Sequence, residues 1–199
     1  MSKGFTEGFY SRPRVDLELL RHHSEGLIAL SACLSGEIPS ALTAGDRERA
    51  ENIAKTYKQI FGKDHFYIEL QNHGIAEQRQ ILPQLYALAR ELGLGVVATN
   101  DVHYTKAEDA QAHDILLCIQ TGKVVTDENR MRYDGGQYFI KSEDEMKALF
   151  PYALQALENT QKIADRCNVE IEFGVTKLPK YEVPEGYDSW TYLNKLCDD

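Results

Sequence analysis

The sequence predicts an α/β fold in which strands and helices alternate in the order β-α-β-α-β-α, followed by a mostly helical extension. Short apolar runs at 26–33, 66–72 and 95–101 have the length of buried strands. Segments with apolar residues at helical spacing lie between and after these runs. Apolar strands that alternate with amphipathic helices indicate a parallel sheet built from right-handed crossover connections.

The first two helices are predicted from their end signals and their apolar stripes. Asp46 can cap the first helix, and apolar residues then recur at helical spacing until Gly62 ends it. The second helix, over 77–93, carries Pro83 within its stripe. Proline lacks the amide proton that a helix interior uses, so we expect a kink or a late helix start there.

Beyond the third strand the pattern changes at Gly122. Thr105 and Glu108 have the spacing of a capping box, which predicts a helix that ends at Gly122. A loop-like stretch follows and leads to "YFIK", which reads as a short strand. Ser142 and Glu145 form a second predicted capping box for a short helix.

The remainder reads as a helix and a linker. Pro151 is expected to open the helix "PYALQALENTQKIADRC", and two proline-containing segments then lead to a terminal helical stretch. Three strands are few for a parallel sheet, which needs both faces covered and here has two open edges. We therefore expect the chain to be a piece of something larger, with open edges that favour self-association.

Composition is that of an ordinary globular protein and excludes some classes. The 199 residues carry a net charge of −9, which argues against binding nucleic acid through a general basic field. No stretch has the roughly 20 apolar residues of a membrane span, and the N-terminus lacks the apolar core of a signal peptide. The widely spaced cysteines are expected to be reduced thiols: Cys33, Cys118, Cys167 and Cys197.

Metal-ligand residue types follow each predicted strand. Cys33 follows the first strand, and Asp101 and His103 follow the third. Ligands of parallel α/β folds bind outside the carboxyl ends of the strands. Side chains two residues apart on an extended segment point the same way, so Asp101 and His103 can converge on one point. Together with Cys33 they form a plausible partial metal site.

Each of these residues also has a structural explanation. A cysteine after an apolar run is usually a small core residue. An aspartate after a strand often serves to stabilise a turn through its side chain. Asn72 and His73 follow the second strand, and His73 fits a ligand role and a hydrogen-bonded role equally well. Nucleophilic catalysis by Cys33 with His103 is the weaker chemical alternative, because no neighbouring pattern suggests an oxyanion hole.

The N-terminal "GFYSRPR" mixes aromatic and basic residues. Such a mixture is found in surfaces that contact nucleic acid. A packing segment whose arginines extend their charged ends into solvent is the favoured interpretation.

Several longer motifs carry a family resemblance. In order, they include "TEGFYSRPRVD", "SEGLIALSACLSGEIP", "FYIELQNHG", "VVATNDVHY" and "AHDILLCIQTGK". The chain resembles the alpha subunits of bacterial replicative DNA polymerase III over nearly its whole length. It is similar to the second half of their N-terminal polymerase-and-histidinol-phosphatase (PHP) domain, at 1–122, and to the extension and linker towards the polymerase core, at 123–199.

The resemblance implies a fold and a metal site. PHP domains are distorted seven-stranded β/α barrels that bind divalent metals, such as Zn, Mn or Mg, at the barrel mouth. Cys33 matches the family's cysteine ligand, and Asp101 and His103 match its Asp-x-His ligand pair. Asn72 and His73 would lie near that site. The family's earlier His-x-His ligands and its polymerase carboxylates are not in this sequence, so the site is expected to be incomplete and the isolated chain inactive.

The resemblance also implies a function for the parent protein. It would be a cytoplasmic DNA-directed DNA polymerase acting in replication, with DNA, a proofreading exonuclease subunit and a sliding clamp as partners. Its PHP domain would be a candidate metal-dependent 3′–5′ exonuclease. The alternative is a non-catalytic scaffold that docks the proofreading exonuclease. A free-standing PHP-type phosphoesterase is a further alternative, which the long segment after Gly122 argues against.

Overall fold

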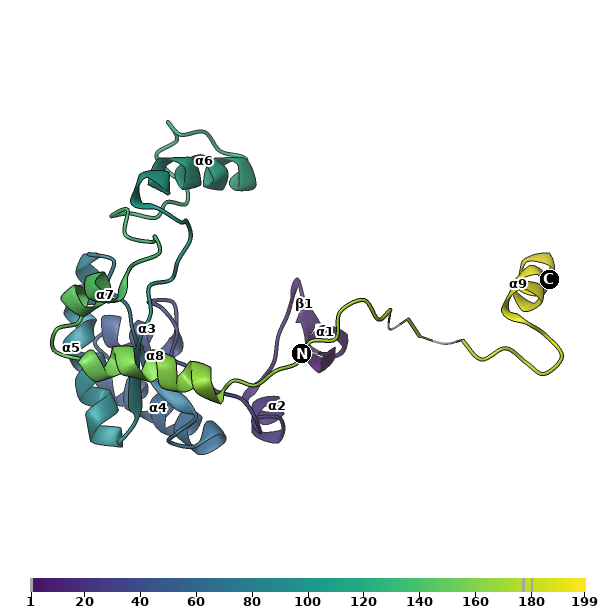
Figure 1. The fold of residues 1–199 in the computed structure, drawn as a ribbon, viewed down its shortest axis with the longest axis horizontal. Coiled ribbons are helices and arrows are strands. Elements are labelled where there is room, and N and C mark those ends of the chain that lie inside the picture. Colours follow the sequence, from purple (N-terminus) through teal and green to yellow (C-terminus); the bar gives the residue numbers. More distant parts are fainter. Residues whose placement is uncertain (1, 177, 180) are drawn as a thin grey trace. The chain divides into compact units, whose positions relative to one another are not determined.

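A computed structural model describes residues 2–176, 178–179 and 181–199 (Figure 1). The chain divides into two compact units, one that ends at Cys167 and one over Asn168–Asp199. Among the described residues, no helix is both long and apolar enough to span a membrane. The predicted domain boundary at residue 122 lies inside the first unit, which also contains the later helices up to residue 166. That boundary stays a prediction.

The first unit contains the predicted parallel sheet. Its strands are β3 (Ala29–Leu30), β4 (Phe66–Leu70) and β5 (Gly95–Ala98), hydrogen-bonded in the order β3-β4-β5. Both pairings are parallel, with Tyr67 opposite Leu30 on one side and Gly95 on the other. All five residues of β4 are buried, as expected for a central parallel strand that is covered on both faces. The α/β prediction is confirmed, although β3 is shorter than its apolar run.

Two crossover helices have the predicted end signals. Helix α4 (Arg47–Phe61) begins after Asp46, whose Oδ1 accepts a hydrogen bond from the backbone N–H of Arg49 at 2.9 Å. It ends at Gly62, which has a φ of 86°. A short helix that the sequence did not predict, α3 (Glu37–Thr43), lies before α4 and buries much of its surface.

Helix α5 (Ala76–Leu92) includes Pro83 in its interior. Of the two expected outcomes, the late start is wrong, because the helix begins seven residues before the proline, and the kink stays a prediction. It ends where predicted, at Gly93, whose φ of 60° lies in the left-handed region that glycine adopts without a steric penalty.

One apolar core joins the helices to the sheet. Side chains of alternate β4 residues, Phe66, Ile68 and Leu70, are at most 1% exposed. They pack with α3, α4, α5 and the segment around Phe150. Burial of this apolar surface supplies the main favourable term for folding, about 25 cal/mol per Å². This core sets the positions of the strand ends.

The chain after β5 departs from the prediction at one helix start. A short 3-10 helix, η1 (Ala107–Asp109), precedes α6 (Ala110–Thr121). The predicted Thr105–Glu108 capping box is wrong. Instead, Asp109 Oδ2 accepts the backbone N–H of Lys106 at 3.0 Å, so the turn starts one residue later. Helix α6 ends at Gly122 as predicted.

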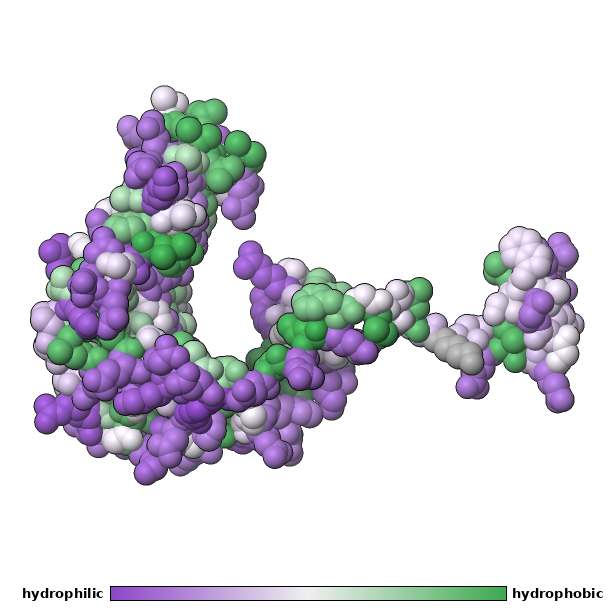
Figure 2. Space-filling view, in the orientation of Figure 1, coloured by the Kyte–Doolittle hydropathy of each residue, from purple (hydrophilic) through white to green (hydrophobic). Residues whose placement is uncertain are grey.

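Helix α6 and the loop after it expose apolar side chains. Figure 2 shows hydrophobic residues gathered at the surface of this segment. Those more than 40% exposed include Ile115, Leu116, Ile119, Val124 and Val125.

Two further helices complete the first unit. The Ser142–Glu145 capping box is confirmed at the start of α7 (Glu143–Leu149), since each residue's side chain accepts the other's backbone N–H. Helix α8 (Leu154–Arg166) packs along β5, and Asn159 Nδ2 donates to Val96 O at 2.8 Å. Pro151 lies in a turn before α8 and does not open it.

The predicted "YFIK" strand is largely wrong. Its Phe139 makes a single parallel bridge with Tyr104 and belongs to no strand. A strand needs a neighbouring segment paired along its length. Here the segment around Tyr104 pairs with Phe139 at one residue only.

The remaining elements are short. The N-terminal ones are α1 (Ser2–Thr6), β1 (Phe9–Tyr10), β2 (Arg12–Pro13) and α2 (Leu17–His22). Strands β1 and β2 form an antiparallel pair, with Phe9 56% and Tyr10 78% exposed. Phe9 packs edge-on against Phe5 and Arg14 lies over the Tyr10 ring, each at 5.5 Å, so the interpretation as a packing segment stays a prediction. In the second unit, α9 (Ser189–Asp198) is the predicted terminal helix.

Candidate metal-binding site at the strand ends

The segment after β5 brings Asp101 and His103 together. His103 Nε2 lies 3.4 Å from Asp101 Oδ1, and both side chains are partly exposed, at 28% and 40%. The predicted convergence is observed, but its cause differs. Asp101 has a φ of 42°, in the left-handed region that aspartate adopts more readily than most residues. The backbone at Asp101 is left-handed and not extended, and the two side chains meet from that conformation.

Cys33 does not join this pair in the structure. It is a partly buried free thiol in the turn after β3. It lines a narrow cavity of about 10 Å³ between β4 and α5, together with Glu69, Gln71 and Gln78. A cavity of this size holds about one water molecule. Within the ranges that the structure describes, no three His, Cys, Asp or Glu side chains are grouped closely enough to hold a metal ion.

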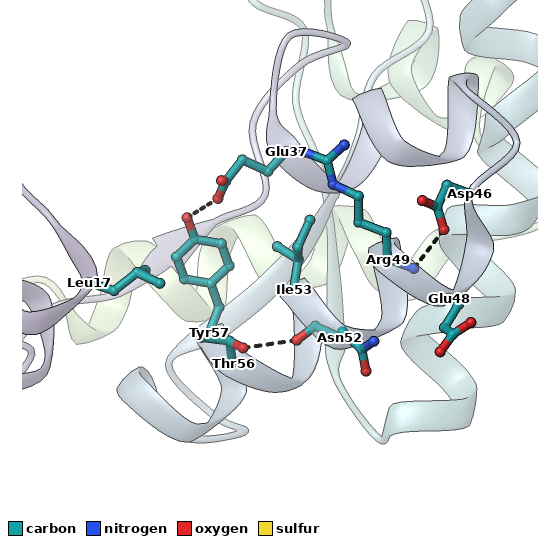
Figure 3. A pocket seen from close by; sticks show the side chains of 9 residues that line it. All are labelled: Leu17, Glu37, Asp46, Glu48, Arg49, Asn52, Ile53, Thr56 and Tyr57. Atoms are coloured by element: carbon teal, nitrogen blue, oxygen red, sulfur yellow. Dashed lines mark hydrogen bonds between the residues drawn. The ribbon is translucent and has the colours of Figure 1, made fainter.

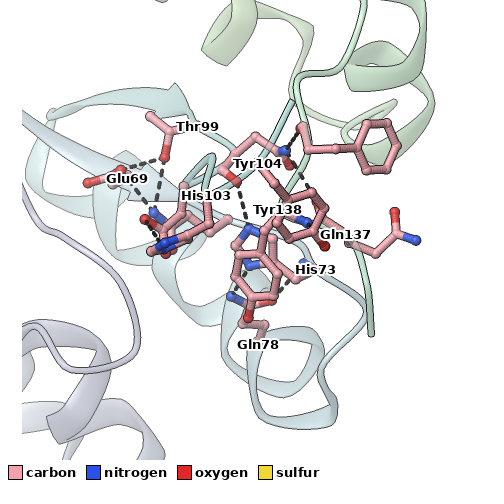
Figure 4. A network of polar contacts seen from close by, with 12 residues as sticks. Glu69, His73, Gln78, Thr99, His103, Tyr104, Gln137 and Tyr138 are labelled. Carbon is pink, nitrogen blue, oxygen red and sulfur yellow. Dashed lines mark hydrogen bonds and ion pairs between the residues drawn. The ribbon is translucent and has the colours of Figure 1, made fainter. Parts of the chain in front are cut away.

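Asn72 and His73 have structural partners. Asn72 Oδ1 accepts the backbone N–H of Gly74 at 3.2 Å, which is the turn chemistry expected of asparagine after a strand. His73 is 1% exposed. Its Nε2 donates to Asn100 O at 2.9 Å, and its Nδ1 accepts from Gln78 Nε2 at 2.9 Å (Figure 4). A carbonyl can only accept, so these contacts specify a neutral imidazole with its proton on Nε2.

Burial controls the titration of this region. Loss of solvent lowers the pKa of His73 below its ordinary value, and the hydrogen bond to Asn100 only partly offsets this. The ring of Tyr138 stacks on His73 with centroids 4.0 Å apart. Burial, followed by the nearby charge of Asp101, raises the pKa of Tyr138 to about 12. Both rings are therefore neutral at physiological pH.

A second polar network lies on the neighbouring strand ends. Glu69 is 9% exposed, and its Oε1 accepts hydrogen bonds from Thr99 Oγ1 and, at 3.2 Å, from Gln71 Nε2. Glu69 and Gln71 are two residues apart on β4 and its extension, so they share one face of the sheet. The two-residue spacing of Glu69 and Gln71 is the feature of the sequence that could have predicted this network.

Two oxygens at these strand ends keep unused acceptor capacity. Among the described residues, the buried atoms Gln71 Oε1 and Asn100 Oδ1 have no hydrogen-bond partner. The Nδ2 of Asn100 is fully used, since it donates to the carbonyls of Gln137 and Phe139 at 3.2 and 2.6 Å. The strand ends are thus rich in oxygen acceptors, the ligand type that hard divalent cations prefer.

Among the described residues, the two most spacious hollows contain none of the predicted site residues. One of about 480 Å³ is open to solvent beside α2 and α4 (Figure 3). Its lining includes Glu37 and Tyr57, which are hydrogen-bonded to each other, and Asp46. Burial and the Glu37 contact raise the pKa of Tyr57 to about 12. None of the site residues predicted from the sequence lines this hollow.

Comparison with known proteins supports the family resemblance. Residues 1–73 match the family model described as PHP domain. The chain is 45% identical to the DNA polymerase III subunit alpha of Treponema pallidum (strain Nichols), over 94% of this chain and 16% of the relative. It is 42% identical to that of Thermus aquaticus over 98% of the chain and 16% of the relative. It is 44% identical to that of Borreliella burgdorferi over 98% and 17%.

The chain therefore spans about one sixth of the length of these relatives. The similarity extends well beyond the PHP match, through the segment after residue 122. The resemblance found in the sequence motifs is confirmed over most of the chain.

Proposed function

We propose that this chain is part of a DNA polymerase III alpha subunit and that the parent protein extends DNA by nucleotidyl transfer. Support comes from 40–45% identity to such subunits over 83–98% of the chain. This chain would be the second half of a PHP-type β/α barrel together with the extension towards the polymerase core. The parallel sheet of β3, β4 and β5 supports this, because such barrels are built from parallel strands.

Within that protein, Asp101 and His103 would be ligands of a divalent metal. The separation of their donor atoms carries this proposal. Two donors that share a tetrahedral metal at about 2.1 Å each lie about 3.4 Å apart. The observed distance is 3.4 Å, whereas a charge-assisted hydrogen bond is about 2.8 Å. The separation is compatible with two ligands of one metal, and it is also close to that of a plain ion pair of this chain, Lys162 with Glu158 at 3.5 Å.

The ligand set needs more residues than these two. Cys33 is the proposed third ligand from this chain, and it follows β3, which is separated from β5 by β4 in the sheet. Further ligands would come from the parts of the parent that precede this sequence. Glu69 and Gln71, which line the same edge of the sheet, would orient the strand ends without being ligands themselves.

A divalent metal at this site would polarise a phosphodiester and lower the pKa of a bound water, as 3′–5′ exonuclease chemistry requires. Asp101 would supply negative charge, and His103 a neutral imidazole nitrogen. The isolated chain holds only a partial ligand set, so we expect no substantial nuclease activity from it.

The partners of the parent would be those of a replicase. They are DNA, a proofreading exonuclease subunit and a sliding clamp, and the setting is the cytoplasm. Among the residues that the structure describes, no contact favours the alternative of a non-catalytic scaffold. It would leave the Asp101–His103 geometry without a role.

The test is the metal content of the full-length polypeptide that carries this chain. Elemental analysis after dialysis would compare the unaltered protein with the Asp101→Ala plus His103→Ala double variant. Asn72→Ala is the control, because its side chain serves a turn. We expect bound metal that the double variant loses and the control keeps. Equal metal content in all three would refute the proposed role of the pair, and absence of metal throughout would favour the scaffold.

A further inference from the structure

The irregular segment between α6 and α7 is attached to the strand end that carries the candidate ligands. Tyr138 is 5% exposed, and its carbonyl accepts a hydrogen bond from the backbone N–H of His103 at 2.8 Å. The Tyr138 ring stacks on His73, which is itself buried. One end of the segment is therefore fixed by backbone and ring contacts together.

The other end is fixed by a bidentate ion pair. Arg130 Nη1 and Nη2 donate to the two carboxylate oxygens of Asp114 on α6 at 2.6 and 2.7 Å. The Arg130 side chain is 3% exposed, and it also donates to the carbonyls of Val125 and Met131 at 3.3 Å. A planar guanidinium that makes paired bonds has a defined orientation, so this contact sets the path of the segment over α6.

Tyr133 lies between these two anchors and packs on the His103 ring. Their ring centroids are 4.3 Å apart, against 5.3 Å from His103 to His113 and 5.7 Å from His103 to Tyr138. Tyr133 also packs edge-on against Tyr138, at 4.9 Å. The half-buried Tyr133 ring is thus held by its contacts with both the His103 ring and the Tyr138 ring.

We infer that Tyr133 is a positioning residue for His103. A partly exposed histidine otherwise exchanges between side-chain rotamers, which would carry Nε2 away from Asp101. The Tyr133 ring lies against the imidazole, with centroids 4.3 Å apart, and this contact would restrict the turning of the imidazole. As regards metal binding, this inference rests on the proposed function. Residues that orient a ligand typically contribute 10- to 100-fold to metal affinity. The contact uses the ring, so phenylalanine should replace tyrosine.

Metal affinity gives the first test, in the full-length polypeptide that carries this chain. Zn²⁺ affinity would be measured by competition with a chromophoric chelator for Tyr133→Ala, Tyr133→Phe and the control Tyr152→Ala. Tyr152 is a matched control because it is 49% exposed and packs on Tyr86 and Phe150, at 6.0 and 6.4 Å.

We expect Tyr133→Ala to weaken Zn²⁺ binding about tenfold or more. Tyr133→Phe and Tyr152→Ala should stay near the unaltered affinity. Unchanged affinity in Tyr133→Ala, or equal loss in Tyr133→Phe, would overturn the inference. His103→Ala, measured in parallel, isolates the proposed function: if that change leaves Zn²⁺ affinity intact, it is the metal proposal that fails.

A second measurement needs no metal. Three-bond NMR couplings report the χ1 rotamer of His103 in the 199-residue chain. We expect one rotamer in the unaltered chain and in Tyr133→Phe, and rotamer averaging in Tyr133→Ala. A single unchanged rotamer in Tyr133→Ala would overturn the positioning role, whatever the outcome of the metal experiment.

Discussion

Replacing His73 by alanine removes the ring that joins β4 to the segment carrying Asp101 and His103. The buried carbonyl of Asn100 and the amide of Gln78 would each lose a hydrogen-bond partner. An unsatisfied buried polar group costs about 1–3 kcal/mol. The lost stacking on Tyr138 adds about 0.5–1.5 kcal/mol. We therefore expect the free energy of unfolding to fall by about 3–5 kcal/mol, a large part of the stability of an ordinary domain.

His73→Phe separates the two contributions. Phenylalanine keeps a ring against Tyr138 but makes neither hydrogen bond, so its loss should be smaller than that of alanine. His22→Ala is the control, because His22 is exposed at the end of α2. Urea unfolding of the 199-residue chain, followed by circular dichroism, measures all three. A loss below about 1 kcal/mol for His73→Ala would refute the structural role assigned to this ring.

The same residue gives a prediction for pH. Burial lowers the pKa of His73 in the folded state, so the unfolded state binds the proton more readily. The stability that neutral His73 contributes is full above the unfolded pKa of about 6.5 and is lost as the pH falls below it. The stability gap between the unaltered chain and His73→Phe should therefore narrow from pH 7.5 towards pH 5, by at most about 1.4 kcal/mol per pH unit. A gap that widens on acidification would contradict this assignment.

Two further changes test the sheet and the segment after α6. Gly95→Ala would place a Cβ 2.6 Å from the Tyr67 ring, whose hydroxyl is hydrogen-bonded to Arg166. We expect a loss of about 1–3 kcal/mol in urea unfolding, and an unchanged midpoint would show that the ring moves freely. Arg130→Gln should release the segment from Asp114, seen as faster amide hydrogen exchange around Tyr133. Unchanged exchange there would show that the ion pair does not fix the segment.

The sequence predicted elements whose ends depend on local chemistry. Helix α4 begins at Asp46 and ends at Gly62 because a side-chain cap and a positive φ act within a few residues. Strand β5 was predictable as a continuous apolar run, and β4 as an apolar run that only Glu69 interrupts. For α5 the helix itself was predictable from its apolar stripe, and only the late start considered at Pro83 did not occur.

Features that depend on distant partners were not predictable in this way. The "YFIK" pattern has strand propensity, but Phe139 meets its neighbour at a single bridge. Asp101 and His103 were identified by type and spacing, whereas the left-handed backbone conformation of Asp101 was not. The contact of Tyr133 with His103 joins two residues thirty positions apart, with α6 between them. No periodicity in the sequence reports such a contact.

The central claim is that Asp101 and His103 share a metal. Anomalous X-ray scattering from crystals of the full-length polypeptide grown with Mn²⁺ tests it most directly. We predict an anomalous peak about 2.0–2.2 Å from both Asp101 Oδ1 and His103 Nε2. Clear density for both side chains, with their 3.4 Å contact intact and no peak between them, would contradict the claim.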